Sequence, residues 1–90
     1  IRTFADKDTE RLFNREPVRR FQAFERVARR KLLQLNQARS LHDLRSPGNS
    51  LEKLEDDRQG QHCIRINDRY RLCFIWRNAD SYEVEIADYH

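Results

Sequence analysis

Apolar residues occupy every second position on both sides of the tripeptide Asn67-Asp68-Arg69. The pattern consists of Ile64, Ile66, Tyr70, Leu72, Phe74 and Trp76. A period of two around a short polar turn predicts a β-hairpin with one apolar face. All six side chains share that face only if Ile64 lies opposite Leu72, because a slip of one residue turns a strand over. The pattern therefore predicts the hairpin and its register together.

The same register sets Arg65 opposite Arg71 on the other face of the hairpin. Two adjacent guanidinium groups repel each other and are better tolerated with an anion between them. The alternative is that each arginine has its own carboxylate, with Glu83 or Glu85 of a following strand as candidates. A two-residue loop would shift the register and separate the arginines.

Helical spacing dominates the first half of the chain. Asp6 is a candidate cap for a short helix that follows an opening strand at residues 1–4. From Pro17 or just after it, spacings of three and four predict a long amphipathic helix with an apolar stripe of Phe24, Val27, Ala28, Leu32 and Leu35. A capping box at Ser40-Leu41-His42-Asp43 then begins a brief helical turn, which residues 46–49 end.

The second half of the chain predicts strands. A strand carrying Glu52, Lys53 and Glu55 precedes a polar turn at residues 56–60, then the hairpin, and a last strand covers residues 82–87. Helices followed by an antiparallel sheet indicate the α+β class. The chain has 90 residues, which we interpret as one domain over residues 1–90.

Composition excludes several functions. No apolar run approaches the roughly 18 residues of a membrane span, and no secretory leader is recognisable, so we expect a cytoplasmic protein without membrane contact. The two cysteines, Cys63 and Cys73, form no zinc quartet. The register sets them opposite each other, and we expect thiols in a reducing cytoplasm. With two glycines, phosphate-cradling loops are nearly excluded, and we expect no metal and no cofactor.

Positive charge is concentrated in the first half. Residues 1–39 contain 11 Lys+Arg and 5 Asp+Glu, whereas residues 40–90 contain 7 and 10. The basic residues of the long helix can attract phosphate or an acidic protein partner, and the plainer interpretation is a solvated helix face. They are Arg19, Arg20, Arg26, Arg29, Arg30 and Lys31.

Side chains with acid–base and phosphate-binding chemistry gather in the second half. They are Arg65, Arg71, Lys53, Glu52, Glu55 and the terminal Asp88-Tyr89-His90. RNA cleavage by a ribose 2′-hydroxyl needs a proton acceptor, cations for the phosphoryl oxygens and a proton donor for the leaving 5′-oxygen. This inventory can supply all three without a metal.

Several stretches together resemble HigB toxins of the RelE/ParE superfamily. They are Leu51-Glu52-Lys53-Leu54, Asp57-Arg58-Gln59-Gly60-Gln61, residues 64–76 and the ending Val84-Glu85-Ile86-Ala87-Asp88-Tyr89-His90, with the turn at residues 41–49 upstream. The resemblance implies a RelE-like fold in which helices cover one face of a twisted, mainly antiparallel sheet. It also implies a ribosome-dependent endoribonuclease that cuts messenger RNA, neutralised by a HigA antitoxin with a helix-turn-helix domain. The toxin–antitoxin pair would bind its own operator DNA.

Carried over to this chain, the resemblance places Arg71 on the scissile phosphate, Asp88 and Tyr89 in the cleft, and His90 as acid or base. Arg65 would assist binding. Related toxins often have His or Lys where Glu52 and Glu55 stand, and these carboxylates repel phosphate. One of them, Glu55, is also a candidate base.

Lys53 would contribute to binding only if it reaches the cleft, because strand alternation points it to the opposite face. Two other functions stay open. One is a ParE-like poison of DNA gyrase, and the other is a weakened toxin that acts mainly as an antitoxin-binding co-repressor.

Overall fold

Four antiparallel strands form one sheet in the order β1-β2-β3-β4. The computed structural model describes residues 1–54 and 60–88. The strands are β1 (Glu52–Lys53), β2 (Gln61–Arg65), β3 (Tyr70–Arg77) and β4 (Asp80–Asp88). The helices are α1 (Lys7–Phe13) and α2 (Glu25–Gln37), with two 3₁₀ helices, η1 (Arg19–Phe24) and η2 (Leu41–Leu44). The predicted α+β class is confirmed.

The β2–β3 hairpin has the predicted register, with Ile64 opposite Leu72 and Arg65 opposite Arg71. The backbone N–H of Ile66 donates to the carbonyl of Tyr70 at 3.0 Å, which makes that pair a hydrogen-bonded one. Because such pairs alternate along an antiparallel ladder, the Arg65/Arg71 pair is a non-hydrogen-bonded one. Side chains lie closest together at such positions.

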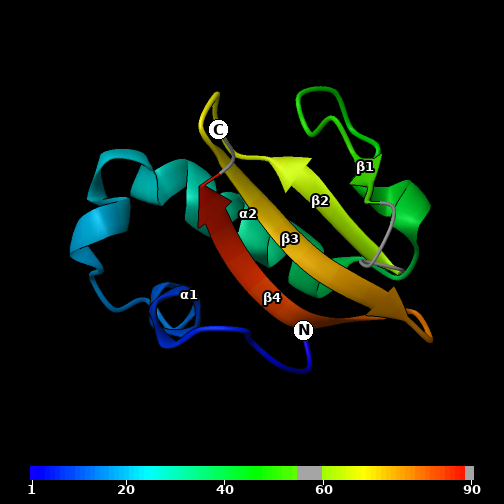
Figure 1. Ribbon diagram of the computed structural model, residues 1–90, viewed down its shortest axis with the longest axis horizontal. Coiled ribbons are helices and arrows are strands. Elements are labelled where there is room, and N and C mark those ends of the chain that lie inside the picture. Colours follow the sequence, from blue (N-terminus) through cyan, green and yellow to red (C-terminus); the bar gives the residue numbers. More distant parts are fainter. Residues whose placement is uncertain (55–59, 89–90) are drawn as a thin grey trace.

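Helix α2 covers one face of the sheet. Figure 1 shows it behind β2 and β3, while the face toward the viewer carries no helix of the described part. We call this second face the open face. The core between α2 and the sheet consists of buried apolar side chains from both layers, among them Ala28, Leu32, Leu35, Ile64, Leu72, Phe74 and Ile86. No helix of the described part is long and apolar enough to cross a membrane.

The long helix begins later than the sequence predicts. Residues 19–24 form η1, and α2 starts at Glu25 instead of near Pro17. Phe21 is fully buried and Phe24 stacks on Tyr70 of β3, with ring centroids 4.5 Å apart. A 3₁₀ turn brings side chains three apart to the same side, so it lets both rings reach the core.

The capping predictions are confirmed. The Asp6 side chain accepts from the backbone N–H of Thr9 at 3.0 Å at the start of α1. At η2, the Asp43 carboxylate accepts from the backbone N–H of Ser40 in the predicted capping box. Both caps satisfy donors that a helix start leaves unpaired.

Residues 1–5 run along β4 as an extended segment with a single β-bridge, Phe4 to Val84, instead of the predicted strand. The pairing is short because β4 is irregular there: its register with β3 shifts between Cys73 and Ile75. Glu83, next to the bridge, has a φ of 51°. Further along this edge, the Ile86 N–H donates to the Thr9 hydroxyl of α1. The N-terminal elements thus cover part of an edge that would otherwise be open to pairing.

Two adjacent leucines of α2 provide a stability test. Leu32 is fully buried, whereas Leu33 is 51% exposed. We expect Leu32→Ala to lower the free energy of unfolding by about 2–5 kcal/mol, because it leaves a cavity in the core. Leu33→Ala should change it by less than about 0.5 kcal/mol. Urea denaturation followed by circular dichroism measures both, and equal losses would contradict this packing of α2.

Candidate functional site

Two arginines form the centre of the candidate site. Arg65 and Arg71 lie directly opposite each other on β2 and β3 and are both half-buried. The Arg65 guanidinium pairs with Asp68 of the hairpin loop, whose side chain is 99% exposed. Arg71 donates to the backbone carbonyl of Asn67 and, at 3.1 Å, to that of Tyr70. Both guanidinium groups are therefore held at the turn end of the hairpin.

Arg65 has a carboxylate partner of its own, as the alternative interpretation expects, but the suggested candidates are wrong. Its partner is Asp68, three residues along the chain, instead of Glu83 or Glu85. Glu83 lies in the irregular part of β4, where its backbone N–H donates to the Thr3 hydroxyl at 2.8 Å. Because Asp68 is fully exposed, its ion pair is one that water and salt weaken. A phosphate can replace such a carboxylate at little cost.

A third arginine, which the sequence analysis did not select, joins this end of the sheet. Arg69 donates to Asp88 through Nε at 2.9 Å and Nη2 at 2.7 Å. The ion pair raises the pKa of the Arg69 guanidinium, chiefly through its hydrogen bonds to Asp88. The register places Asp88 opposite Tyr70, on the side of the sheet that faces the helices. Asp88 is thus near the arginine pair but on the other side of the strand ladder.

The register also separates the two charged residues of β1. Glu52 lies opposite Cys63 and so on the open face with the arginine pair. Lys53 lies opposite His62, on the α2 side. The structure therefore brings Glu52 to the open face and does not bring Lys53 there, as strand alternation predicts. The remaining predicted site residues, Glu55, Tyr89 and His90, lie outside the described residues.

A small apolar cluster lies beside the arginine pair on the open face. It contains Leu54, Cys63 and Cys73, with Ala87 packed against them. The two cysteines lie opposite each other as predicted, and both are thiols that are 1% exposed. Apolar surroundings weaken competition from water, so they strengthen the attraction between a nearby guanidinium and an anion.

Behind the open face, a buried polar network connects α2 to β2. The Lys31 ammonium donates to the Asn49 side-chain oxygen, and both side chains are buried. The Asn49 carbonyl accepts from the backbone N–H of Arg65 at 2.6 Å. Lys31 is therefore not part of the basic helix surface that the sequence predicts. The spacing of the sequence does indicate this burial, because Lys31 stands four residues after Val27 and four before Leu35 on the apolar stripe.

Among residues 1–54 and 60–88, no His, Cys, Asp and Glu side chains gather as a metal-binding group. The described part of the open face offers anion binding by guanidinium groups. Arg65 and Arg71 supply it on the open face, where the Asp68 carboxylate holds Arg65 and carbonyl oxygens hold Arg71.

Comparisons with known proteins identify the family of this chain. The model of the RelE-like toxin of the type II toxin–antitoxin system HigB matches residues 2–90. The chain belongs to this HigB-like toxin family. It is also 38% identical over 76 residues to Toxin HigB-1 of Vibrio cholerae serotype O1 (strain ATCC 39315 / El Tor Inaba N16961), a match that covers 81% of this chain and 80% of that protein. The helices on one side of an antiparallel sheet are consistent with the RelE-like fold. Membership of a toxin–antitoxin family implies an antitoxin as partner.

The buried lysine gives a pH-dependent prediction. Burial, reinforced by Arg30 and Arg65, lowers the pKa of Lys31 below its ordinary value. At pH values just below the ordinary lysine pKa of about 10.4, the unfolded chain therefore binds more protons than the folded chain. The free energy of unfolding rises with pH in this range. We expect this rise to be smaller in Lys31→Met.

The midpoints of urea denaturation of the wild type and of Lys31→Met, measured between pH 8 and pH 10.5, give the difference in pH dependence. Other titrating groups are common to the two chains and cancel in the comparison. Equal slopes would contradict a lowered pKa at Lys31.

Proposed function

We propose that this HigB-like toxin is a ribosome-dependent endoribonuclease that cuts messenger RNA and so arrests translation in the cytoplasm. The observation that carries the proposal is the register that places Arg65 beside Arg71 on the open face. Two adjacent cations beside a dry patch form a site for a phosphate. Family membership supports the same assignment.

The proposed reaction is attack of a ribose 2′-hydroxyl on the adjacent phosphate. The bond from O2′ to phosphorus forms and the bond from phosphorus to O5′ breaks. A base takes the 2′-hydroxyl proton and an acid gives a proton to the 5′-oxygen. In this proposal Arg71 stabilises the charge on the phosphoryl oxygens and Arg65 holds the strand, with no metal required.

His90 is the proposed acid or base, with Tyr89 beside it. Both follow Asp88 directly in the sequence, and Asp88 pairs with Arg69 at the end of β4. We assign Asp88 a positioning role through that ion pair. Glu55 remains a candidate base, and Glu52 adds negative charge to the open face.

The proposed partner is a HigA-type antitoxin with a helix-turn-helix domain. In the complex, the antitoxin neutralises the nuclease and carries the toxin to operator DNA. The free toxin has a net charge of +3, which favours an acidic partner surface.

Two substitutions test the nuclease assignment. We expect Arg71→Ala and His90→Ala each to lower the rate of message cleavage on programmed ribosomes by at least ~100-fold, the usual scale for losing a charge-stabilising or acid–base group. Single-turnover cleavage of a labelled message measures the rate. Arg77→Ala is the matched control, because Arg77 stands on the same face at the far end of β3.

Wild-type cleavage by both variants would refute the assignment. Inhibition of DNA gyrase by a chain that leaves messages intact would instead place the toxin with ParE-like proteins. In that function the acidic Glu52 and Glu55 would be no handicap.

The pairing of Arg65 gives a prediction on RNA affinity. Asp68→Ala removes the carboxylate that occupies this guanidinium. We expect the affinity for a single-stranded RNA oligonucleotide to rise by about 3- to 5-fold at low salt, and the gain to disappear at high salt. Fluorescence anisotropy measures it. Glu10→Ala, which removes an exposed charge on α1, is the control, and an equal gain there would show a mere net-charge effect.

A further inference from the structure

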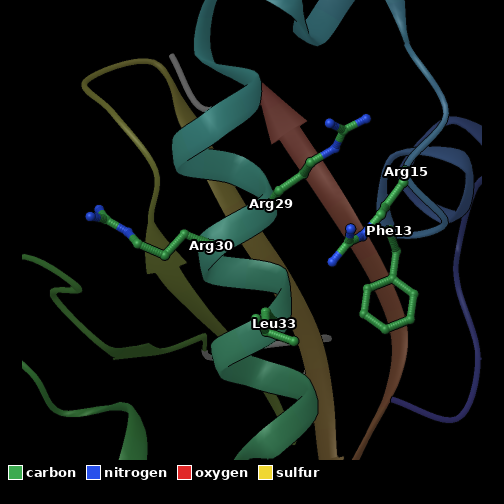
Figure 2. A pocket seen from close by; sticks show the side chains of 5 residues that line it. All are labelled: Phe13, Arg15, Arg29, Arg30 and Leu33. Carbon is green, nitrogen blue, oxygen red and sulfur yellow. The ribbon is translucent and has the colours of Figure 1, made fainter.

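One cation of α2 lies inside the molecule. Figure 2 shows Arg29 and Arg30 leaving the helix on opposite sides, with Arg29 over the groove between α1 and α2. Lys31, the next residue, is only 6% exposed. Among residues 1–54 and 60–88, its ammonium bonds to the amide oxygen of Asn49 and to no carboxylate. Burying an ammonium without a counter-charge costs free energy that an apolar side chain would avoid. Packing alone therefore gives no reason for a lysine here.

Asn49 connects this lysine to the backbone of Arg65. It is 1% exposed, and its side-chain nitrogen donates to the Leu44 carbonyl at 3.0 Å and to the Ser46 hydroxyl at 3.2 Å. Its own backbone carbonyl accepts from the N–H of Arg65 at 2.6 Å. These bonds fix both the side chain and the backbone of Asn49, so a change at Lys31 is transmitted to Arg65.

The N–H of Arg65 needs this acceptor because the sheet has no strand for it. Arg65 and Arg71 form a non-hydrogen-bonded pair, so the N–H of Arg65 points away from β3. The register of β1 with β2 covers His62 and Cys63 and ends before Arg65. The Asn49 carbonyl therefore takes the place of a missing strand beside the proposed phosphate site.

Electrostatic repulsion opposes this placement of Arg65. Its guanidinium group lies beside that of Arg71, and like charges directly opposite each other destabilise a strand pair. The exposed Asp68 relieves Arg65 only weakly, since water and salt screen that ion pair. Burial, then Arg30 and Arg65, lower the pKa of Lys31, so Arg65 and the buried ammonium also repel each other. An anion bound at Arg65 relieves both repulsions.

We propose that Lys31 is a positioning residue of the phosphate site, which holds the backbone of Arg65 through its hydrogen bond to Asn49. The inference rests on the proposed nuclease and adds to it a residue behind the sheet. Lys31 contacts no RNA in this arrangement, because α2 lies on the other side of the sheet from the open face. Its loss therefore weakens RNA binding at Arg65 and leaves charge stabilisation by Arg71 in place.

A double-mutant cycle between Lys31 and Arg65 tests this role. We expect Lys31→Met to lower the affinity for a single-stranded RNA oligonucleotide by about 10-fold in the wild-type background and by less than about 2-fold in Arg65→Ala. The maximal rate of message cleavage should stay within about 2-fold of the wild type, because Arg71 is retained. Fluorescence anisotropy measures the affinity. Lys7→Met, at an exposed lysine of α1, is the control for the loss of one charge.

The variant Lys31→Gln separates the hydrogen bond from the charge. Glutamine loses the charge but retains a donor for the Asn49 oxygen, so its affinity for RNA should stay within about 3-fold of the wild type. An affinity as low as that of Lys31→Met would overturn the proposal, because Lys31 would then act by long-range charge. This variant decides the question even if Lys31→Met fails to fold.

Amide hydrogen exchange follows the Arg65 backbone directly. In Lys31→Met, the N–H of Arg65 should exchange at least ~10-fold faster than in the wild type, whereas the N–H of Ile66, which donates to Tyr70, should keep its rate. Unchanged exchange at Arg65, or an equal loss of RNA affinity with and without Arg65, would overturn the proposal. If the wild type binds RNA but cleaves nothing, the nuclease proposal fails while the cycle and the exchange rates still decide the role of Lys31.

Discussion

The pairing of β2 with β3 is the constraint on which the rest of the structure depends. Ile64 and Leu72 must share a face to bury against α2, and this requirement fixes the register. Once the register is fixed, Arg65 and Arg71 must lie side by side on the other face. The apolar core thus positions the charged site, and the repulsion between two cations is a consequence of packing.

Charge on this molecule is divided between two faces of the sheet. On the open face, guanidinium groups are held by Asp68 and by carbonyl oxygens at the hairpin turn, beside a patch that excludes water. On the helix side, Arg15 and Arg29 border an apolar groove. Helix α2 lies between these two groups of arginines, and the nuclease proposal uses only the pair on the open face.

The sequence predicted the elements that follow from periodicity and capping. The hairpin, its register and the Asp6 and Ser40 caps are local patterns, and all are confirmed. The start of α2 was missed because tertiary burial of Phe21 favours a 3₁₀ turn over continued α-helix. The partner of Arg65 and the burial of Lys31 were missed because both depend on loops, around Asp68 and Asn49, whose course no periodicity describes. Glu55, Tyr89 and His90 remain predictions.

The most direct test of the account is to induce the chain in bacteria and map the ends of translated messages, while following supercoiling of a reporter plasmid in the same cells. We expect new cuts within translated messages that disappear when Arg71 is replaced by alanine, with supercoiling unchanged. Intact messages together with altered supercoiling would contradict it, because the arginine pair would then serve a protein target instead of a phosphate.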